Sequence, residues 1–154
     1  MIMNSIGKDA EVLPESLALA IDEHFDEQVS LCFALEKIAD SLPEDFDPQM
    51  CLKAAKSIYP VFKGAHDFEE DVLFPYLAKK NDDSDRLQHI FNRLHAEHWE
   101  DESFGEEVSE ALIDLVHGEQ NNPEKLGYML RGFFEGVKRH IAFEREHLVP
   151  LIKK

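Results

Sequence analysis

Two short stretches of the chain place a histidine and a glutamate four residues apart among apolar neighbours. The first pair is His66 and Glu70, and the second is His140 and Glu144. On an α-helix this spacing brings both side chains to the same face. Around the first pair that face is otherwise apolar, with Ala55, Tyr59, Phe62, Leu73 and Leu77. A buried imidazole and carboxylate are costly unless something pairs with them, and a metal ion is one such partner.

Four of the eight histidines lie on or beside the apolar stripes of four different predicted helices: His24, His66, His98 and His140. Each lies near the middle of its helix, so an up-down bundle would bring them to one level. A single core histidine is as often hydrogen-bonded to a neighbour as bound to a metal. Four at one level, with two inward carboxylates, favour a metal centre. His95, three residues before His98, is placed to share its metal.

The spacing of histidine and acid is weak evidence when taken alone. A third pair, His98 and Glu102, has the same separation, and such pairs arise by chance in so acidic a chain. The convergence of the four helices is therefore the informative feature.

The donor set indicates which metals the site would accept. Imidazole and carboxylate ligands suit iron, zinc, copper or nickel. Two carboxylates with four or five imidazoles exceed the four ligands of a tetrahedral zinc. They match two metals roughly 3.5–4 Å apart that share oxygen ligands. Ferritin-like di-iron bundles need two Glu-x-x-His motifs, and only Glu144 and His147 have that spacing, so this architecture is disfavoured.

Helix signals divide the chain into four long segments. Pro14 starts the first segment, which runs to about Asp40. Asp47-Pro48 starts the second segment, which runs to about Lys80. We expect a kink in it at Pro60 and a disturbed end at Pro75. A polar turn at 81–85 leads into the third.

Gly118 is placed to end the third segment, and Asn122-Pro123 starts the fourth. Short polar turns between long amphipathic helices predict an all-α protein, an antiparallel up-down four-helix bundle with the metal centre in its core. We expect one domain over 14–154 and a loose N-terminal arm over 1–13.

Composition excludes several classes of partner. The 154 residues include 32 acidic and 16 basic side chains, a formal net charge of −16, which repels nucleic acid and anionic lipid. No apolar stretch approaches the ~18 residues that span a bilayer. The start of the chain lacks a signal-peptide pattern, and the two cysteines show no paired spacing. We therefore expect a cytoplasmic protein with no nucleic acid or membrane partner; a protein partner is unknown.

The ordered set of motifs resembles the hemerythrin-like, or HHE cation-binding, domain family. The matching pieces are Asp-Glu-His24-Phe, His66-x3-Glu70 with Leu-Phe-Pro75, Ala-Glu-His98, and His140-x3-Glu144 with Leu-Val-Pro150. They cover nearly the whole chain after residue 14 in the family's order. The resemblance implies a non-haem di-iron centre in which Glu70 and Glu144 bridge the irons and the histidines are terminal ligands. It also implies binding or sensing of oxygen, iron, nitric oxide or redox state.

The third helix departs from the oxygen-carrying members of that family. They place two histidines four residues apart there, whereas His95 and His98 are three apart. A missing histidine would leave a coordination position for water or for another carboxylate, with Asp67 and Glu69 as candidates.

Three functions remain open on the sequence. The first is a di-iron protein that binds or senses a small diatomic molecule such as oxygen. The second is a di-iron enzyme acting on peroxide or nitric oxide. The third is a helical interaction domain whose metal is structural, with zinc as a possible substitute for iron. No positioned cysteine or arginine accompanies the histidines, which favours binding or sensing over catalysis.

Overall fold

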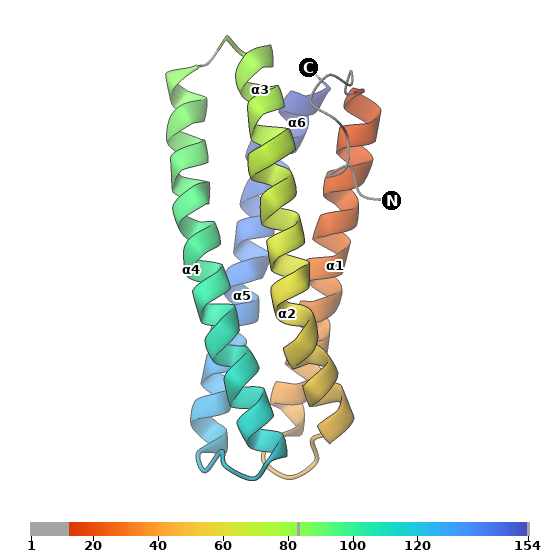
Figure 1. The fold of residues 1–154 in the computed structure, drawn as a ribbon, viewed down its shortest axis with the longest axis vertical. Helices are drawn as coiled ribbons and strands as arrows, with labels where there is room; N and C mark the ends of the chain where they lie inside the picture. The colour runs from red at the N-terminus through yellow and green to blue at the C-terminus, as the bar shows by residue number, and fades with distance from the viewer. Residues whose placement is uncertain (1–12, 83, 154) are drawn as a thin grey trace.

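The structure, a computed structural model, describes residues 13–82 and 84–153, so the predicted arm lies almost entirely outside the described residues. Four long rods run alternately up and down (Figure 1). They are α1 (Pro14–Ser41), α2 (Pro48–Phe68) with its continuation η2 (Glu69–Leu73) and α3 (Phe74–Lys80), α4 (Asp85–Val116), and α5 (Pro123–His147). A short α6 (Val149–Ile152) follows α5, and none of the described residues lies in a strand. The predicted all-α four-helix bundle is confirmed.

Two of the long helices, α2 and α5, begin at a capping side chain. Asp47 Oδ1 accepts from the backbone N–H of Gln49, and Asn122 Oδ1 accepts from that of Lys125. Each cap is followed by a proline in the first turn, where the missing N–H costs no intrahelical bond. These caps fix the register of α2 and α5, the helices that carry the two His-x3-Glu motifs.

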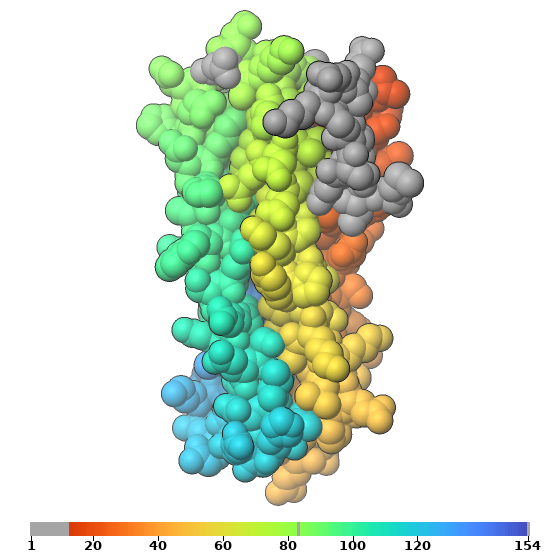
Figure 2. Space-filling model, in the orientation of Figure 1, coloured from red at the N-terminus to blue at the C-terminus, as the bar shows by residue number. Residues whose placement is uncertain are grey.

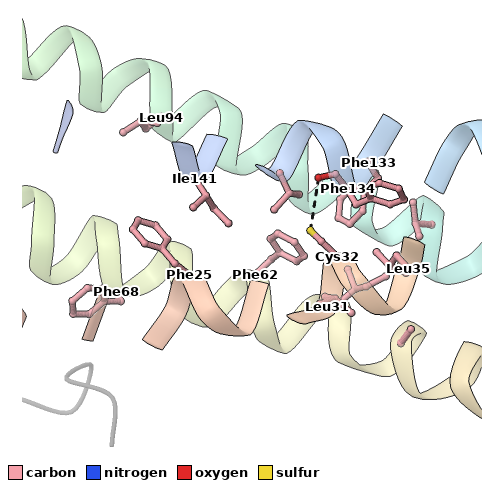
Figure 3. Packing of buried hydrophobic residues seen from close by; sticks show 14 of the residues in the cluster. Phe25, Leu31, Cys32, Leu35, Phe62, Phe68, Leu94, Phe133, Phe134 and Ile141 are labelled. Atoms are coloured by element: carbon pink, nitrogen blue, oxygen red, sulfur yellow. Dashed lines mark hydrogen bonds between the residues drawn. The ribbon is translucent and has the colours of Figure 1, made fainter. Parts of the chain in front are cut away.

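Aromatic rings fill much of the core between the four rods (Figure 3). Phe62 of α2 and Phe133 of α5 meet edge to face, with ring centroids 5.4 Å apart. Cys32 of α1 is buried and its thiol lies 3.8 Å from the carbonyl oxygen of Phe134, the contact dashed in Figure 3. Such a core orders the helices on both sides of the inward histidines.

The second rod contains one wide turn. α2 continues past Pro60, and the departure from α-helical bonding comes at η2, where the N–H of Phe74 donates to the carbonyl of Glu69. Pro75 has no N–H to give to Asp71, so the α-helical bond at that point cannot form. Wide turns of this kind are rare and often occur at functional sites. The turn begins directly after the α-helical segment that carries His66.

On the face shown in Figure 2, α2 and α4 lie side by side along the molecule. None of the described helices is both long and apolar enough to cross a membrane.

At Gly105, α4 packs tightly against its neighbours. A Cβ there would lie 2.8 Å from Ile58 Cγ2 and 3.4 Å from Phe133 Cζ, both in buried side chains. We expect Gly105→Ala to destabilise the fold by about 1–2 kcal/mol, because overpacking outweighs the gain in helix propensity. Gly132 of α5 is exposed, and its Cβ would meet only Phe104 Cζ at 3.8 Å. Gly132→Ala should therefore stabilise by about 0.5–1 kcal/mol; urea unfolding of both variants measures the opposite signs.

Candidate metal centre

Each of the four long rods sends a polar side chain into the middle of the bundle. His24 comes from α1, His66 and Glu69 from the second rod, His98 from α4, and His140 and Glu144 from α5. All are buried except His140, whose side chain is still only 8% exposed. Three of the four predicted histidines, His66, His98 and His140, lie close together, with ring centroids 3.9 to 6.4 Å apart.

Four of these residues form a compact group. Glu69, His98, His140 and Glu144 each offer a ligand atom, and these atoms lie within 4.8 Å of one another. His98 Nε2 is 3.1 Å from Glu69 Oε2, and His140 Nε2 is 3.5 Å from Glu144 Oε2. His66 stacks on the ring of His98 with centroids 3.9 Å apart. The group is small enough for one cation to touch all four members.

The core also holds buried polar atoms that make no hydrogen bond of normal geometry, although His98 Nε2 lies 3.1 Å from Glu69 Oε2. Among the described residues, the buried side-chain nitrogens and oxygens without a hydrogen-bond partner are His24 Nδ1 and Nε2, Glu69 Oε1, His98 Nε2, His140 Nε2 and Glu144 Oε1. Leaving such an atom unpaired costs about 1–3 kcal/mol. Every one of them is an imidazole nitrogen or a carboxylate oxygen, the donor types that bind iron and zinc. The residues therefore fit a metal ion.

Burial and neighbouring charge set the protonation of the group. Burial, together with the negative charge of Glu144, raises the pKa of Glu69 well above its usual range. Burial opposes ionisation of Glu144 too, yet the neighbouring Glu69 and His140 hold its pKa below the usual value. Burial and the charges of His98 and His140 lower the pKa of His66 to about 2. Without a cation, the pair of carboxylates keeps a proton on Glu69, and His66 is neutral.

Metal uptake near neutral pH should therefore release protons. A cation at the centre takes the place of the Glu69 proton, since a carboxylate must be ionised to bind a metal. We expect calorimetric titrations with a divalent metal to give heats that vary with the ionisation enthalpy of the buffer, corresponding to about one or more protons released per chain. Heats independent of the buffer would show that Glu69 is already ionised in the metal-free protein.

Some of the metal ligands predicted from the sequence belong to the buried group of four, and others lie outside it. Glu70, the predicted bridging carboxylate, is 28% exposed and lies outside the group of four. Its Oε2 is 3.0 Å from His98 Nδ1, and its Oε1 pairs with His95 Nδ1. His95 is 73% exposed. His24 is buried against Phe68, with ring centroids 5.0 Å apart, but is not one of the four. Their roles as ligands stay predictions.

Of the two substitute carboxylates, the structure brings Glu69 to the centre and leaves Asp67 at the surface, paired with Lys63 at 3.0 Å. In a regular helix Glu70 would lie about 40° from the direction of His66, and Glu69 about 60° to the other side. The two directions differ little in their angle to His66, so spacing alone does not decide between them, and in the structure Glu69 is the buried one. The backbone from His66 to Glu69 is regular α-helix, and the wide turn before Pro75 follows it.

Carboxylates outside the centre support the histidines, and the sequence analysis did not find this arrangement. Glu102 Oε2 lies 2.8 Å from His66 Nδ1, and Glu70 supports His98 in the same way. Carboxylates of Asp101 and Glu97 lie 3.8 Å from His140 Nδ1. A carboxylate that accepts from Nδ1–H fixes the tautomer and leaves Nε2 free for a metal.

A buried histidine and carboxylate cluster at mid-height of a four-helix bundle defines a metal-binding helical protein. A family model described as the hemerythrin HHE cation-binding domain matches residues 18–152, nearly the whole chain, and the chain belongs to this family. Comparisons with curated proteins and with solved structures gave no significant match.

Proposed function

We propose that this chain holds two iron ions in the core of the bundle and uses them to bind or sense a small diatomic molecule, with oxygen the first candidate. The observation that carries the proposal is the set of buried imidazole nitrogens and carboxylate oxygens without hydrogen-bond partners on side chains from all four rods, among which Glu69, His98, His140 and Glu144 form one compact group. The donors are His24, His66, His98, His140, Glu69 and Glu144, with Glu70 and His95 just outside.

Two metals account for this set better than one. Four buried imidazoles and two buried carboxylates exceed the ligands of a tetrahedral zinc, and two carboxylates can each bridge a metal pair. An iron pair would supply reversible one-electron chemistry and a coordination position for a diatomic ligand. Zinc could fill the same donors without that chemistry.

The chain's own residues orient and protect the site. Glu102 and Glu70 hold the rings of His66 and His98 by their Nδ1 atoms. Phe62 and Phe68, both buried, lie against His66 and His24 and keep bulk water away. A rigid, dry site with fixed ligands suits a binding or sensing protein.

The sulfur chemistry of the chain agrees with a binding role. Burial raises the pKa of Cys32 to about 12, so it offers no thiolate for catalysis. Cys32 and Cys51 are both free and buried, which supports a reducing compartment, the cytoplasm.

A second candidate is an enzyme that acts on peroxide or nitric oxide at the same centre. A groove of about 300 Å³ between α4 and α5 reaches His140 and is lined by Arg93 and Arg139. It would admit a small molecule to one edge of the centre.

One series of spectra distinguishes these functions. The full-length protein is loaded with ferrous iron without oxygen, exposed to oxygen, and then returned to an oxygen-free buffer. A reversible change in the absorption spectrum is expected for oxygen binding, and a single oxidation per chain for sensing. Sustained consumption of peroxide or nitric oxide would favour the enzyme. Tightly held metal with no spectral response would show a structural metal and contradict the proposal.

A further inference from the structure

A cavity separate from the metal centre lies in the seam between α2 and α4, the two helices on the face shown in Figure 2. Its volume is about 550 Å³. Gly105 and Ile58 meet at the bottom of the cavity, where the missing side chain lets the two helices pack closely, since a Cβ would lie only 2.8 Å from Ile58 Cγ2. The cavity is large enough for a small organic molecule.

Three aromatic rings line this cavity: Tyr59, Phe62 and Trp99. Phe62 is buried, but Tyr59 is 62% exposed and Trp99 is 71% exposed. Phe33 and Tyr128 are exposed on this surface as well, but Tyr59 and Trp99 differ from single exposed rings in lining the same cavity. The faces of such rings attract ammonium groups, and tryptophan does so best.

Three carboxylates complete the lining: Glu102, Glu106 and Glu110. They follow one another at intervals of four residues along α4, so they form a row with a rise of about 6 Å between neighbours. No lysine, arginine or histidine is among the residues that line the cavity. The charge of the cavity is complementary to a ligand with more than one positive group.

We propose that this cavity binds a linear aliphatic diamine or triamine. A four-carbon spacer separates two ammonium groups by roughly 6 Å when extended, which is comparable with the spacing of the carboxylate row. The methylenes would lie between the exposed rings of Tyr59 and Trp99, and the ammonium groups would meet the carboxylates and the faces of these rings. Neither a metal ion nor a monoamine uses all of these features.

The cavity also touches the metal centre through one shared residue. Glu102 lines the cavity, and its Oε2 lies 2.8 Å from His66 Nδ1. An ammonium group at Glu102 competes with His66 for the carboxylate, so amine binding alters the support of that ring. This effect on the centre rests on the proposed function, whereas binding of the amine does not.

Trp99 is the single tryptophan of the chain, so its fluorescence reports on the cavity directly. Metal-loaded protein is titrated at near-physiological salt with two polyamines, namely 1,4-diaminobutane and a triamine that has one three-carbon and one four-carbon spacer. The monoamine 1-aminobutane is titrated in the same way for comparison. We expect both polyamines to shift the emission and to bind at least tenfold more tightly than the monoamine. The double variant Glu106→Gln/Glu110→Gln, whose exposed positions do not touch the centre, should weaken diamine binding at least tenfold.

The control is Glu107→Gln, an exposed glutamate next to Glu106 that does not line the cavity, and it should bind as the wild type does. Equal weakening in this variant would show diffuse attraction to an acidic surface and would overturn the proposal. Equal affinity for the monoamine or for magnesium would overturn it too. A short lysine-rich peptide that binds while the diamine does not would assign the cavity to a protein partner instead. Failure of the iron experiments would leave these results unchanged.

Discussion

Glu69→Ala and Glu144→Ala are each expected to empty the metal centre, whereas Glu70→Ala keeps the metals with weakened affinity. Glu69 and Glu144 belong to the buried group of four. Each substitution removes a carboxylate that two metals would share. Glu70 supports His98 from outside, and loss of such a partner typically costs about 10–100-fold in metal affinity. Metal content after dialysis and a competition titration measure both effects.

Asp71→Ala is the matched control for this series, since Asp71 is an exposed carboxylate in the same wide turn. It should retain the full metal content. The reverse pattern, with Glu70→Ala empty and Glu69→Ala full, would mean that the metal-bound protein rewinds this turn. The second rod would then follow the regular helical phase that the sequence predicts.

Acid should destabilise the metal-free protein less when His66 is replaced by glutamine. Burial lowers the pKa of His66 to about 2 from an ordinary value of 6.5, so the unfolded chain takes up a proton that the folded chain refuses. The stability contributed by neutral His66 is complete above pH 6.5 and is lost as the pH falls below it. The loss is about 1.4 kcal/mol per pH unit, or roughly 2 kcal/mol between pH 6.5 and 5.0.

The comparison of wild type with His66→Gln isolates this contribution. Glu69 and His140 have raised pKa values and change stability in the opposite direction, but they are present in both proteins. Urea unfolding of metal-free protein at several pH values gives the two slopes, and the exposed His89→Gln serves as the control. Equal slopes for wild type and His66→Gln would mean that His66 reaches solvent in the folded state.

The sequence predicts the fold well because its signals are local. Asp47 and Asn122 are capping residues followed by proline, and the structure starts helices there. The stripes of apolar residues place His24, His66, His98 and His140 toward the axis, and all four lie in the interior. Packing of four amphipathic faces leaves few alternatives to this arrangement.

The details of the site depend on small angles and on contacts between helices. In a regular helix Glu69 and Glu70 point to either side of the His66 direction at similar angles, so the packing of the neighbouring helices decides which of them is buried. Spacing alone pairs Glu102 with His98 on its own helix, but the structure pairs it with His66 of α2. Such a contact depends on how far two helices are shifted along the bundle axis relative to each other. The helical periodicity of a single segment gives no information about that shift.

The claim that two iron ions lie in the core is tested most directly by anomalous diffraction from crystals of protein produced with ample iron. Data collected on both sides of the iron absorption edge should give two iron peaks per chain, roughly 3.5–4 Å apart. The peaks should lie among His98, His140, Glu69 and Glu144, the group of four identified in the core. A single tetrahedral zinc in that position, or no metal peak in the core, would contradict the account.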